Sequence, residues 1–234
     1  MDKNTNTKAG ACNLKLGIDD SGRGPVIGPM ILAGCLIDEE IEKEFKKLGV
    51  KDSKLLTPKR REVLAELVKE KAITFEITIT HPDEITQRNH SGVNLNTLEA
   101  IKAAEIINKI NKGLSEVLVI VDCPSPNIKA WQGTLERYIH NKSNLIIKCE
   151  HKADKNHLAC SAASIIAKHI REKEIAKIKE KIGKDFGSGY VHDPKTCEFL
   201  EKYSEQHKKD GIFRETWQTW KNQCAKNAQK KLEF

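Results

Sequence analysis

The sequence predicts an α/β domain with a mixed sheet, followed by a helical C-terminal region. Strand-like apolar runs cluster early in the chain and then alternate with helical patterns, which is typical of α/β folds. One continuous apolar run, Val117–Val121, indicates a strand buried on both faces. The length of 234 residues fits one domain with a small appendage. We therefore expect a domain over 14–185 and a helical extension over 186–234.

The first part of the chain should contain a loose polar tail, two strands, two helices and a third strand. Gly49 should end the first helix, whereas Thr57 and Pro58 are the N-cap and first residue of the second. The third strand alternates apolar and polar residues, as a half-buried strand does. In order, these elements are 1–13, Leu14–Ile18, Met30–Ile37, Glu39–Leu48, Pro58–Lys71 and Ile73–Thr80.

The second part should alternate helices with two further strands. Its clearest helix, over Asn94–Lys112, has apolar residues at helical spacing and should end at Gly113. The basic segment after His207 carries no clear pattern. In order, the expected elements are Pro82–Arg88, Asn94–Lys112, Val117–Val121, Asn127–Ile139, Leu145–Cys149, Asn156–Ile182 and Asp193–His207.

Composition narrows the class of protein. The net charge of +7 suits a polyanionic partner, although lysines on solvated helix faces would give the same value. The seven cysteines are scattered singly, and no signal peptide is recognised, so we expect reduced thiols and a cytoplasmic protein. No apolar run approaches the ~18 residues of a membrane span.

The decapeptide Lys15–Gly24 carries the strongest chemical signal. An apolar run delivers Asp19 and Asp20 to a glycine-rich turn that contains Arg23. Carboxylates bind hard cations, and an arginine flanked by glycines can approach a phosphate backbone. The segment therefore predicts half of a metal site beside a phosphodiester grip, although a strand-ending turn would use the same residues.

Two later carboxylates are candidates for the rest of the site. Asp122 directly follows the buried strand, where α/β proteins place ligands, and Asp154 lies between a strand and the long helix. A turn-forming role for Asp122 and a helix-capping role for Asp154 are the alternatives. Four converging carboxylates repel one another unless cations neutralise them, so they suit one Mg²⁺ or two held ~4 Å apart.

An ordered series of motifs resembles the type 2 ribonucleases H, most closely the archaeal form of ribonuclease HII. It covers roughly residues 14 to 220. The series comprises Gly17-Ile-Asp-Asp-Ser-Gly-Arg-Gly-Pro-Val-Ile-Gly-Pro29, Lys51-Asp-Ser-Lys-Leu, Asn94-Leu-Asn-Thr-Leu-Glu99, Val121-Asp122, His151-Lys-Ala-Asp154, Ser161-Ala-Ala-Ser-Ile-Ile-Ala-Lys168, Gly187-Ser-Gly-Tyr190, Asp193-Pro-Lys-Thr196 and Arg214-x-Thr-Trp217.

The resemblance implies a ribonuclease H-like fold with a five-stranded mixed sheet flanked by helices. It implies a monomer that cleaves the RNA strand of RNA/DNA hybrids and nicks duplex DNA at embedded ribonucleotides, leaving 3′-hydroxyl and 5′-phosphate ends. Mg²⁺ or Mn²⁺, in two sites, would be required. The catalytic metal ligands would be Asp19, Asp20, Asp122 and Asp154. The loop of Gly22, Arg23 and Gly24 would read the ribose 2′-hydroxyl, largely through backbone groups.

The sequence departs from the family pattern in two places. Asp20 stands where the family normally has Glu, and it is shorter by one C–C bond, ~1.5 Å. His157-Leu158 replaces the usual Tyr-Pro, so His157 would be the flat ring beside the scissile nucleotide, or else an exposed first-turn histidine. The runner-up function is therefore a hybrid-binding homologue with weak or Mn²⁺-restricted catalysis. A metal-dependent phosphohydrolase of small molecules is a third alternative, which the basic composition disfavours.

Further contacts are expected around these motifs. Lys54, Ser161, Ser164 and Lys168 are candidate phosphate ligands, with a solvated loop lysine and close helix packing as the alternatives. Tyr190, Trp217 and Trp220 are interpreted as structural. The C-terminal residues Gln229, Leu232 and Phe234 resemble a truncated sliding-clamp-binding box that would make a weak contact; a basic tail without a partner is the alternative.

Overall fold

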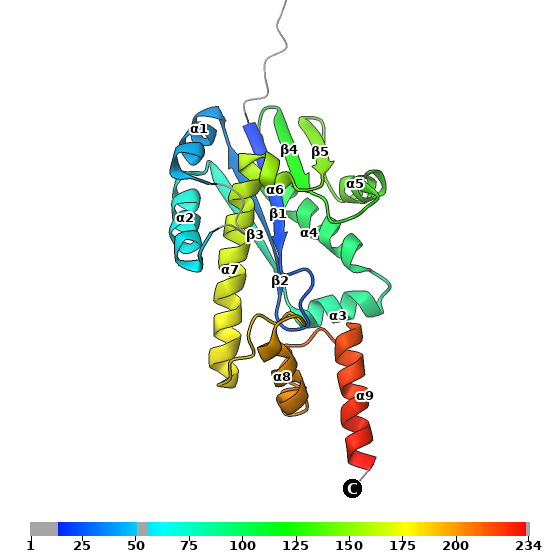
Figure 1. The fold of residues 1–234 in the computed structure, drawn as a ribbon. Coiled ribbons are helices and arrows are strands. Elements are labelled where there is room, and N and C mark those ends of the chain that lie inside the picture. Colours follow the sequence, from blue (N-terminus) through cyan, green and yellow to red (C-terminus); the bar gives the residue numbers. More distant parts are fainter. Residues whose placement is uncertain (1–13, 51–55, 233–234) are drawn as a thin grey trace, which may run out of the picture.

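The structure, a computed structural model, describes residues 14–50 and 56–232. It contains a five-stranded mixed sheet in the order β3-β2-β1-β4-β5, as the sequence predicts (Figure 1). The central strand β1 is antiparallel to β2 and parallel to β4, β2 is antiparallel to β3, and β5 is parallel to β4. The strands are β1 Leu14–Ser21, β2 Met30–Ile37, β3 Thr74–Thr80, β4 Val117–Asp122 and β5 Leu145–Glu150.

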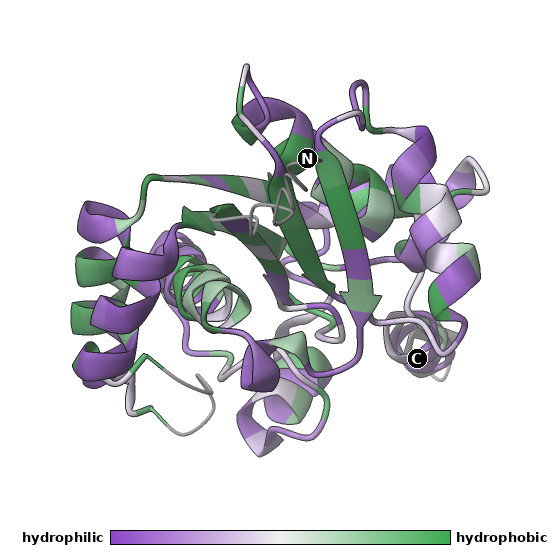
Figure 2. Cartoon of the chain, turned by 90° about the horizontal axis from the view of Figure 1, so that it is seen from above, coloured by the Kyte–Doolittle hydropathy of each residue, from purple (hydrophilic) through white to green (hydrophobic). Residues whose placement is uncertain are grey.

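Helices cover both faces of this sheet. The helices α4 and α5 bury one face, and α1, α2 and the long α7 bury the other (Figure 1). Seen from above, the apolar strands lie between these helical layers (Figure 2). The helices are α1 Glu39–Leu48, α2 Pro58–Lys71, α3 Pro82–His90, α4 Leu95–Ile110, α5 Ile128–Arg137, α6 Ala153–Asn156, α7 Leu158–Ile182, α8 Pro194–Tyr203 and α9 Gln218–Leu232.

Capping residues place several helix ends where the sequence predicts them. The Thr57 hydroxyl accepts a hydrogen bond from the Arg60 N–H, and Gly49 ends α1 in the left-handed conformation. The Asn94 side chain likewise caps α4. The expected end of α4 at Gly113 is wrong, because the helix stops at Ile110 and its cap is Asn111.

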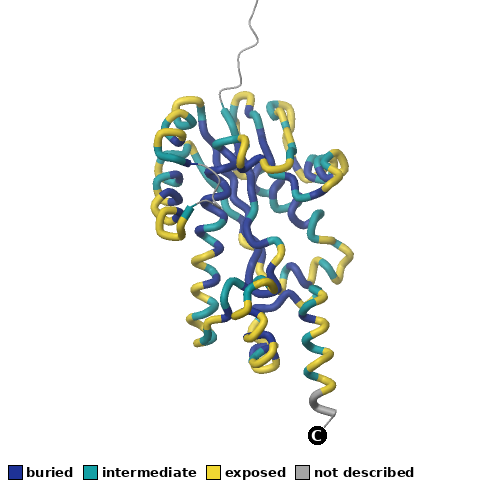
Figure 3. The backbone as a smooth tube through the Cα atoms, viewed as in Figure 1, coloured by how far each residue is buried: buried dark blue, intermediate teal, exposed yellow. Residues whose placement is uncertain are grey.

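Two helix predictions need correction. The long helix does not begin at Asn156: the short α6 precedes it, and His157 is extended (φ −130°, ψ 124°) between the two. The second concerns the basic segment after His207: it lies in the expected helical extension but was given no helix bounds, and it contains α9. Most of α9 is exposed, whereas the central strands β1 and β2 and the first half of α7 are mostly buried (Figure 3).

The two faces of β1 fix how the first carboxylates point. Leu16 and Ile18 pack in the core beneath α4, so Asp20 shares that face. Gly17 lies against α7, where a Cβ would approach the Ala159 carbonyl carbon to 2.1 Å, so Asp19 shares the α7 face. The predicted strand Leu14–Ile18 extends to Ser21, which places both aspartates inside it.

A separate apolar cluster attaches the C-terminal region to the sheet domain. It joins the loop residues Val26 and Ile27 to Ile175 of α7 and to aromatic residues between 186 and 220. Ile27 also pairs with Phe213 in an isolated β-bridge. The loop that follows β1 is therefore built on the C-terminal region.

Candidate active site

The four predicted carboxylates surround one pocket of about 200 Å³ at the end of β1. A larger cavity of about 600 Å³ lies between α8 and α9, but its walls carry only one carboxylate, Glu201. The smaller pocket is therefore the candidate site. Its lining is Asp19, Asp20, Ser21, Gly22, Arg23, Gly24, Asp122, Asp154, Lys168 and Tyr190.

Asp19 and Asp20 reach this pocket from opposite faces of β1. Asp19 is held by a hydrogen bond from Ser164 of α7, while burial and then the neighbouring Asp20 raise its pKa well above the usual value. Burial also raises the pKa of Asp20 to about 6; the Arg23 guanidinium opposes this rise and Asp122 adds to it. Burial thus makes the charged form of each carboxylate unfavourable, and a bound cation would offset that cost.

Asp122 and Asp154 are positioned by the backbone that follows β4 and β5. Ile18 pairs with Val121 in the parallel ladder, so Asp122 ends its strand beside Asp19. Its Oδ1 accepts a hydrogen bond from the Ala153 N–H at 2.9 Å. Asp154 lies in α6 and is 4% exposed. The site therefore draws on β1, on β4 and on the short helix that follows β5.

The donor set fits a hard divalent cation. All four candidate ligands are carboxylates around one pocket, which is the oxygen chemistry that Mg²⁺ and Mn²⁺ prefer. Across residues 14–50 and 56–232, no three His, Cys, Asp or Glu side chains are already arranged as a coordination shell. The fit therefore rests on the shared pocket and on the raised pKa values of Asp19 and Asp20.

Arg23 is held differently from the sequence-based expectation. Its guanidinium donates to the side chains of Glu99 and Asn96 at the start of α4. Glu99 is buried; burial and then the Asp20 charge raise its pKa well above the usual value, and Arg23 opposes the shift. Arg23 thus lines the pocket while its charge is matched by a protein carboxylate. Sequence reasoning missed the role of Glu99, although it lies in a motif that was recognised.

Not all of the candidate phosphate ligands lie at the pocket. Lys168 lines the pocket, and its Nζ lies 3.4 Å from the Ser164 hydroxyl. Ser161 is not part of the lining: its hydroxyl donates to the backbone carbonyls of Asp154 at 2.5 Å and His157 at 3.2 Å. Its hydroxyl therefore bridges the break between α6 and α7. Lys54 lies outside the described residues.

The ring that borders the pocket is Tyr190, not His157. The His157 Nε2 lies 2.9 Å from the Glu150 carboxylate, outside the pocket lining. Tyr190 lies against Gly24, where an added Cβ would meet its ring at 3.5 Å. The sequence suggested only a structural role for Tyr190, whereas the structure places it at the pocket.

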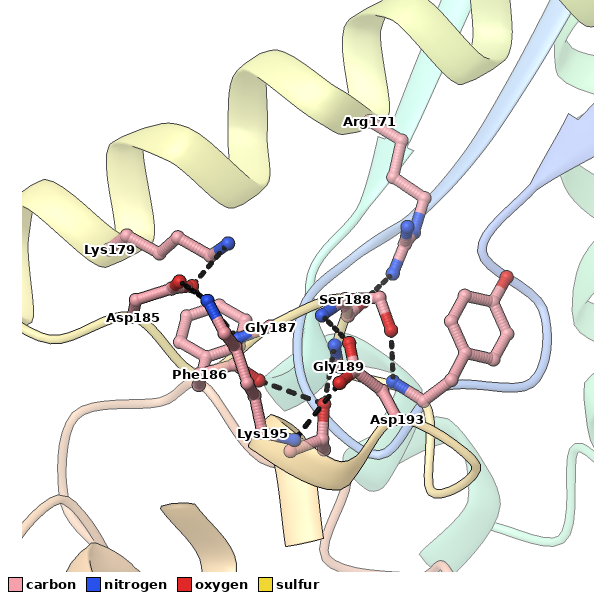
Figure 4. Close-up of polar contacts among 11 residues, drawn as sticks. Arg171, Lys179, Asp185, Phe186, Gly187, Ser188, Gly189, Asp193 and Lys195 are labelled. Atoms are coloured by element: carbon pink, nitrogen blue, oxygen red, sulfur yellow. Dashed lines mark hydrogen bonds and ion pairs between the residues drawn. The ribbon is translucent and has the colours of Figure 1, made fainter. Parts of the chain in front are cut away.

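Polar contacts hold the loop between Asp185 and Lys195 in a compact arrangement (Figure 4). The Asp193 carboxylate accepts the Ser188 N–H at 2.7 Å, and Arg171 donates to the Ser188 carbonyl at 2.8 Å. The same guanidinium lies 4.9 Å from the centre of the Tyr190 ring. Gly187 and Gly189 adopt positive φ angles, so the Gly-Ser-Gly-Tyr spacing was the available sequence signal.

Comparisons with known proteins agree with this geometry. The family described as Ribonuclease HII matches residues 16–220. Ribonuclease HII of Methanocaldococcus jannaschii is 43% identical over 227 residues, spanning 93% of this chain and 97% of that protein. Ribonuclease HII of Pyrococcus furiosus is 40% identical over 204 residues, spanning 87% and 88%.

Solved structures give the same result. The ribonuclease H2 of Pyrococcus horikoshii OT3 superposes with a TM-score of 0.79 at 37% identity, covering 90% of this chain and 96% of that one. A ribonuclease HII from Archaeoglobus fulgidus, solved as a complex with PCNA, has a TM-score of 0.77 at 36% identity, covering 88% and 95%. The more distant Bst-RNase HIII, 20% identical, shares the fold. This chain belongs to the ribonuclease HII family.

Proposed function

We propose that this protein hydrolyses the RNA strand of RNA/DNA hybrids and nicks duplex DNA at embedded ribonucleotides. In-line attack of water, assisted by two Mg²⁺ or Mn²⁺ ions, would leave 3′-hydroxyl and 5′-phosphate ends. The observation that carries the proposal is the gathering of four carboxylates, Lys168 and the Gly22–Gly24 loop around one pocket. Within the described residues, no helix is both long and apolar enough to cross a membrane.

The chain's own groups divide the work. Asp19, Asp20, Asp122 and Asp154 would hold the cations. When bound, these ions lower the pKa of the attacking water and stabilise the leaving oxygen. Ser164 orients the Asp19 carboxylate, and the Ala153 N–H orients that of Asp122. Lys168 supplies a positive charge for the scissile phosphate.

Substrate selection is assigned to the glycine loop and the neighbouring ring. Only the 2′-hydroxyl distinguishes RNA from DNA at one nucleotide, and glycines let a backbone approach it closely. Gly22 has φ 87°, and an added Cβ would lie 2.6 Å from the Arg171 side chain. Tyr190, at the edge of the same pocket, is proposed to contact the adjacent nucleotide, in addition to the role expected for His157.

A duplex with a single ribonucleotide tests this proposal. Wild-type protein should nick this duplex only when the ribonucleotide is present and Mg²⁺ or Mn²⁺ has been added. The identical all-deoxy duplex is the control. Binding of the ribonucleotide duplex without a nick under either ion would contradict an active enzyme.

The runner-up is a hybrid-binding homologue with weak or Mn²⁺-restricted catalysis. The position of Asp20 favours it, because that carboxylate leaves β1 on the face opposite Asp19 and is short for its task. A rate with Mn²⁺ far above that with Mg²⁺ would support this alternative. His157 lies outside the pocket lining, and its part in this alternative stays a prediction.

We also propose a weak sliding-clamp contact through Gln229, Leu232 and Phe234. Gln229 is exposed near the end of α9, while Phe234 lies outside the described residues. The Archaeoglobus fulgidus relative was solved in complex with PCNA, which supports testing such a contact here. Wild-type protein should co-elute with a matching clamp, and a chain ending before Gln229 should not. Equal co-elution of both would exclude this segment.

A further inference from the structure

One buried arginine from the C-terminal region holds the backbone of the glycine loop. The guanidinium of Arg214 donates to the carbonyl oxygens of Gly22 at 2.5 Å, Arg23 at 2.7 Å and Gly28 at 3.0 Å. The Trp217 indole N–H donates to the carbonyl of Gly24 at 3.3 Å. All three carbonyls of the loop that borders the pocket are therefore bound by residues about 190 positions later in the chain.

These bonds determine where the loop's amides point. In a trans peptide the C=O and the following N–H point in opposite directions. With the Gly22 and Arg23 carbonyls turned toward Arg214, the N–H groups of Arg23 and Gly24 are turned away from it. Neither N–H donates a backbone hydrogen bond to another described residue. Both residues line the carboxylate pocket, so two successive donors are available to a ligand there.

Arg214 is itself rigidly held and fully buried. Its exposed fraction is 0%, and its own N–H donates to the Val26 carbonyl at 2.9 Å. The next residue, Glu215, donates its N–H to the Thr86 hydroxyl at 3.2 Å. A planar guanidinium presents several donors in a fixed fork, which a lysine ammonium cannot reproduce. Arg214 is therefore suited to fixing several carbonyls at once.

We propose that Arg214 is a positioning residue for ribonucleotide recognition: it orients the Gly22–Gly24 loop so that the Arg23 and Gly24 amides face the ribose 2′-hydroxyl. The inference rests on the proposed function, since it needs a substrate that carries this hydroxyl. Trp217 assists by fixing the last carbonyl of the loop. Arg214 does not touch the reacting atoms.

The test compares Arg214→Lys and Arg214→Gln with wild type. Binding to matched duplexes with one ribonucleotide or none is measured with Ca²⁺ in place of Mg²⁺, and nicking is measured with Mg²⁺. Both variants should lose the binding preference for the ribonucleotide, and kcat should fall by roughly tenfold or more because the loop is misplaced. Affinity for the all-deoxy duplex should stay within about twofold, because phosphate contacts remain.

A matched variant separates positioning from stability. Phe199 packs on Phe186 and Phe213 in the C-terminal cluster, and its ring has no donor for the carbonyls of the glycine loop. Phe199→Leu should lower the melting temperature while keeping the ribonucleotide preference. Trp217→Phe keeps an aromatic ring but loses the indole N–H, and should give an intermediate loss of preference.

The outcomes distinguish a failure of the proposed function from a failure of the role proposed for Arg214. Wild-type protein that does not nick the ribonucleotide duplex contradicts the proposed function. Wild-type nicking together with an unchanged preference and kcat in folded Arg214→Gln would overturn only the role of Arg214. The same holds if Phe199→Leu loses the preference as fully as the Arg214 variants do.

Discussion

Asp20 leaves β1 on the face opposite to that of Asp19. It leaves β1 beneath α4, whereas Asp19 lies on the α7 face with Ser164. To act with Asp19, Asp122 and Asp154, its carboxylate must extend around the end of the strand. One further methylene would shorten that gap, which makes position 20 the most informative place to change a single side chain.

Lengthening this side chain should raise activity. We expect Asp20→Glu to increase the Mg²⁺-dependent kcat on the order of tenfold, because a misplaced ligand of about 1 Å is costly in catalysis. The measurement is single-turnover nicking across a Mg²⁺ titration. Asp19→Glu is the matched control and should lower kcat, since its neighbour Ser164 is fully buried. A rate for Asp20→Glu at or below wild type would contradict this reading of the strand geometry.

Removing the charge at the same position should stabilise the metal-free protein at neutral to basic pH. Folding raises the Asp20 pKa from 3.8 to about 6, so the native state binds the proton more tightly than the unfolded state. Stability from this group is complete below about pH 4 and is lost as the pH rises through 6. Asp20→Asn should therefore be more stable than wild type at about pH 8, by up to about 3 kcal/mol, and not at about pH 4.

Urea unfolding in the presence of a chelator measures this difference. Added Mg²⁺ should stabilise wild type more than Asp20→Asn, because only wild type keeps the full set of ligands. An equal stability difference at both pH values would show that Asp20 is not the titrating group.

At the scale of elements, the contact between β1 and α7 places the site. An added Cβ at Gly17 would lie 2.1 Å from the Ala159 carbonyl carbon and 2.2 Å from the Cys160 nitrogen. This close approach brings Ser164 of α7 to Asp19 of β1. The Ser161 hydroxyl of α7 donates to the Asp154 carbonyl across the break between α6 and α7, and this contact helps to fix the position of Asp154.

A methyl group at position 17 should therefore force the helix and strand apart. We expect Gly17→Ala to lower the free energy of unfolding by about 3 kcal/mol, since neither backbone can yield easily. Gly133, inside α5, is the matched control because no atom lies within 4 Å of its added Cβ. Gly133→Ala should raise stability by about 1 kcal/mol through helix propensity. Denaturant unfolding of both variants provides the check.

An element can be predicted from the sequence when the contacts that determine its ends lie close together along the chain. Thr57 and Asn94 cap their helices through residues three positions away, so local sequence predicts those ends. Asp122 was predicted at the site because it follows a buried strand. The break between α6 and α7 coincides with the extended backbone of His157 and with the bridging hydroxyl of Ser161, neither of which a helical period reports.

The residues that bind the glycine loop were harder to predict, because they lie far from it along the chain. Glu99 pairs with Arg23 across 76 positions, and Arg214 reaches Gly22 across 192. In the sequence, a charged residue that will be buried beside a distant partner cannot be distinguished from one that will be exposed to solvent. The family resemblance marked these motifs but could not assign their contacts, and Lys54 is still a prediction.

At the scale of the molecule, the net charge of +7 should make substrate binding depend on salt. The logarithm of the association constant should fall linearly with the logarithm of salt concentration, with a slope of about −0.9 for each phosphate contacted. Lys168→Gln should reduce the slope by about one. Lys109→Gln is the control, because Lys109 pairs with Glu76 on an exposed surface outside the pocket lining. Salt-independent binding would favour a small-molecule substrate.

The contacts between the glycine loop and residues 214–217 also bear on biosynthesis. A ribosome releases the loop early, whereas Arg214 and Trp217 emerge only after nearly two hundred further residues. Until then the Gly22, Arg23 and Gly24 carbonyls lack their donors, even if the strands have already paired. With Arg214 acting as proposed, a chain that stops before residue 214 should lack selective cleavage, because its glycine loop has no donors for these carbonyls.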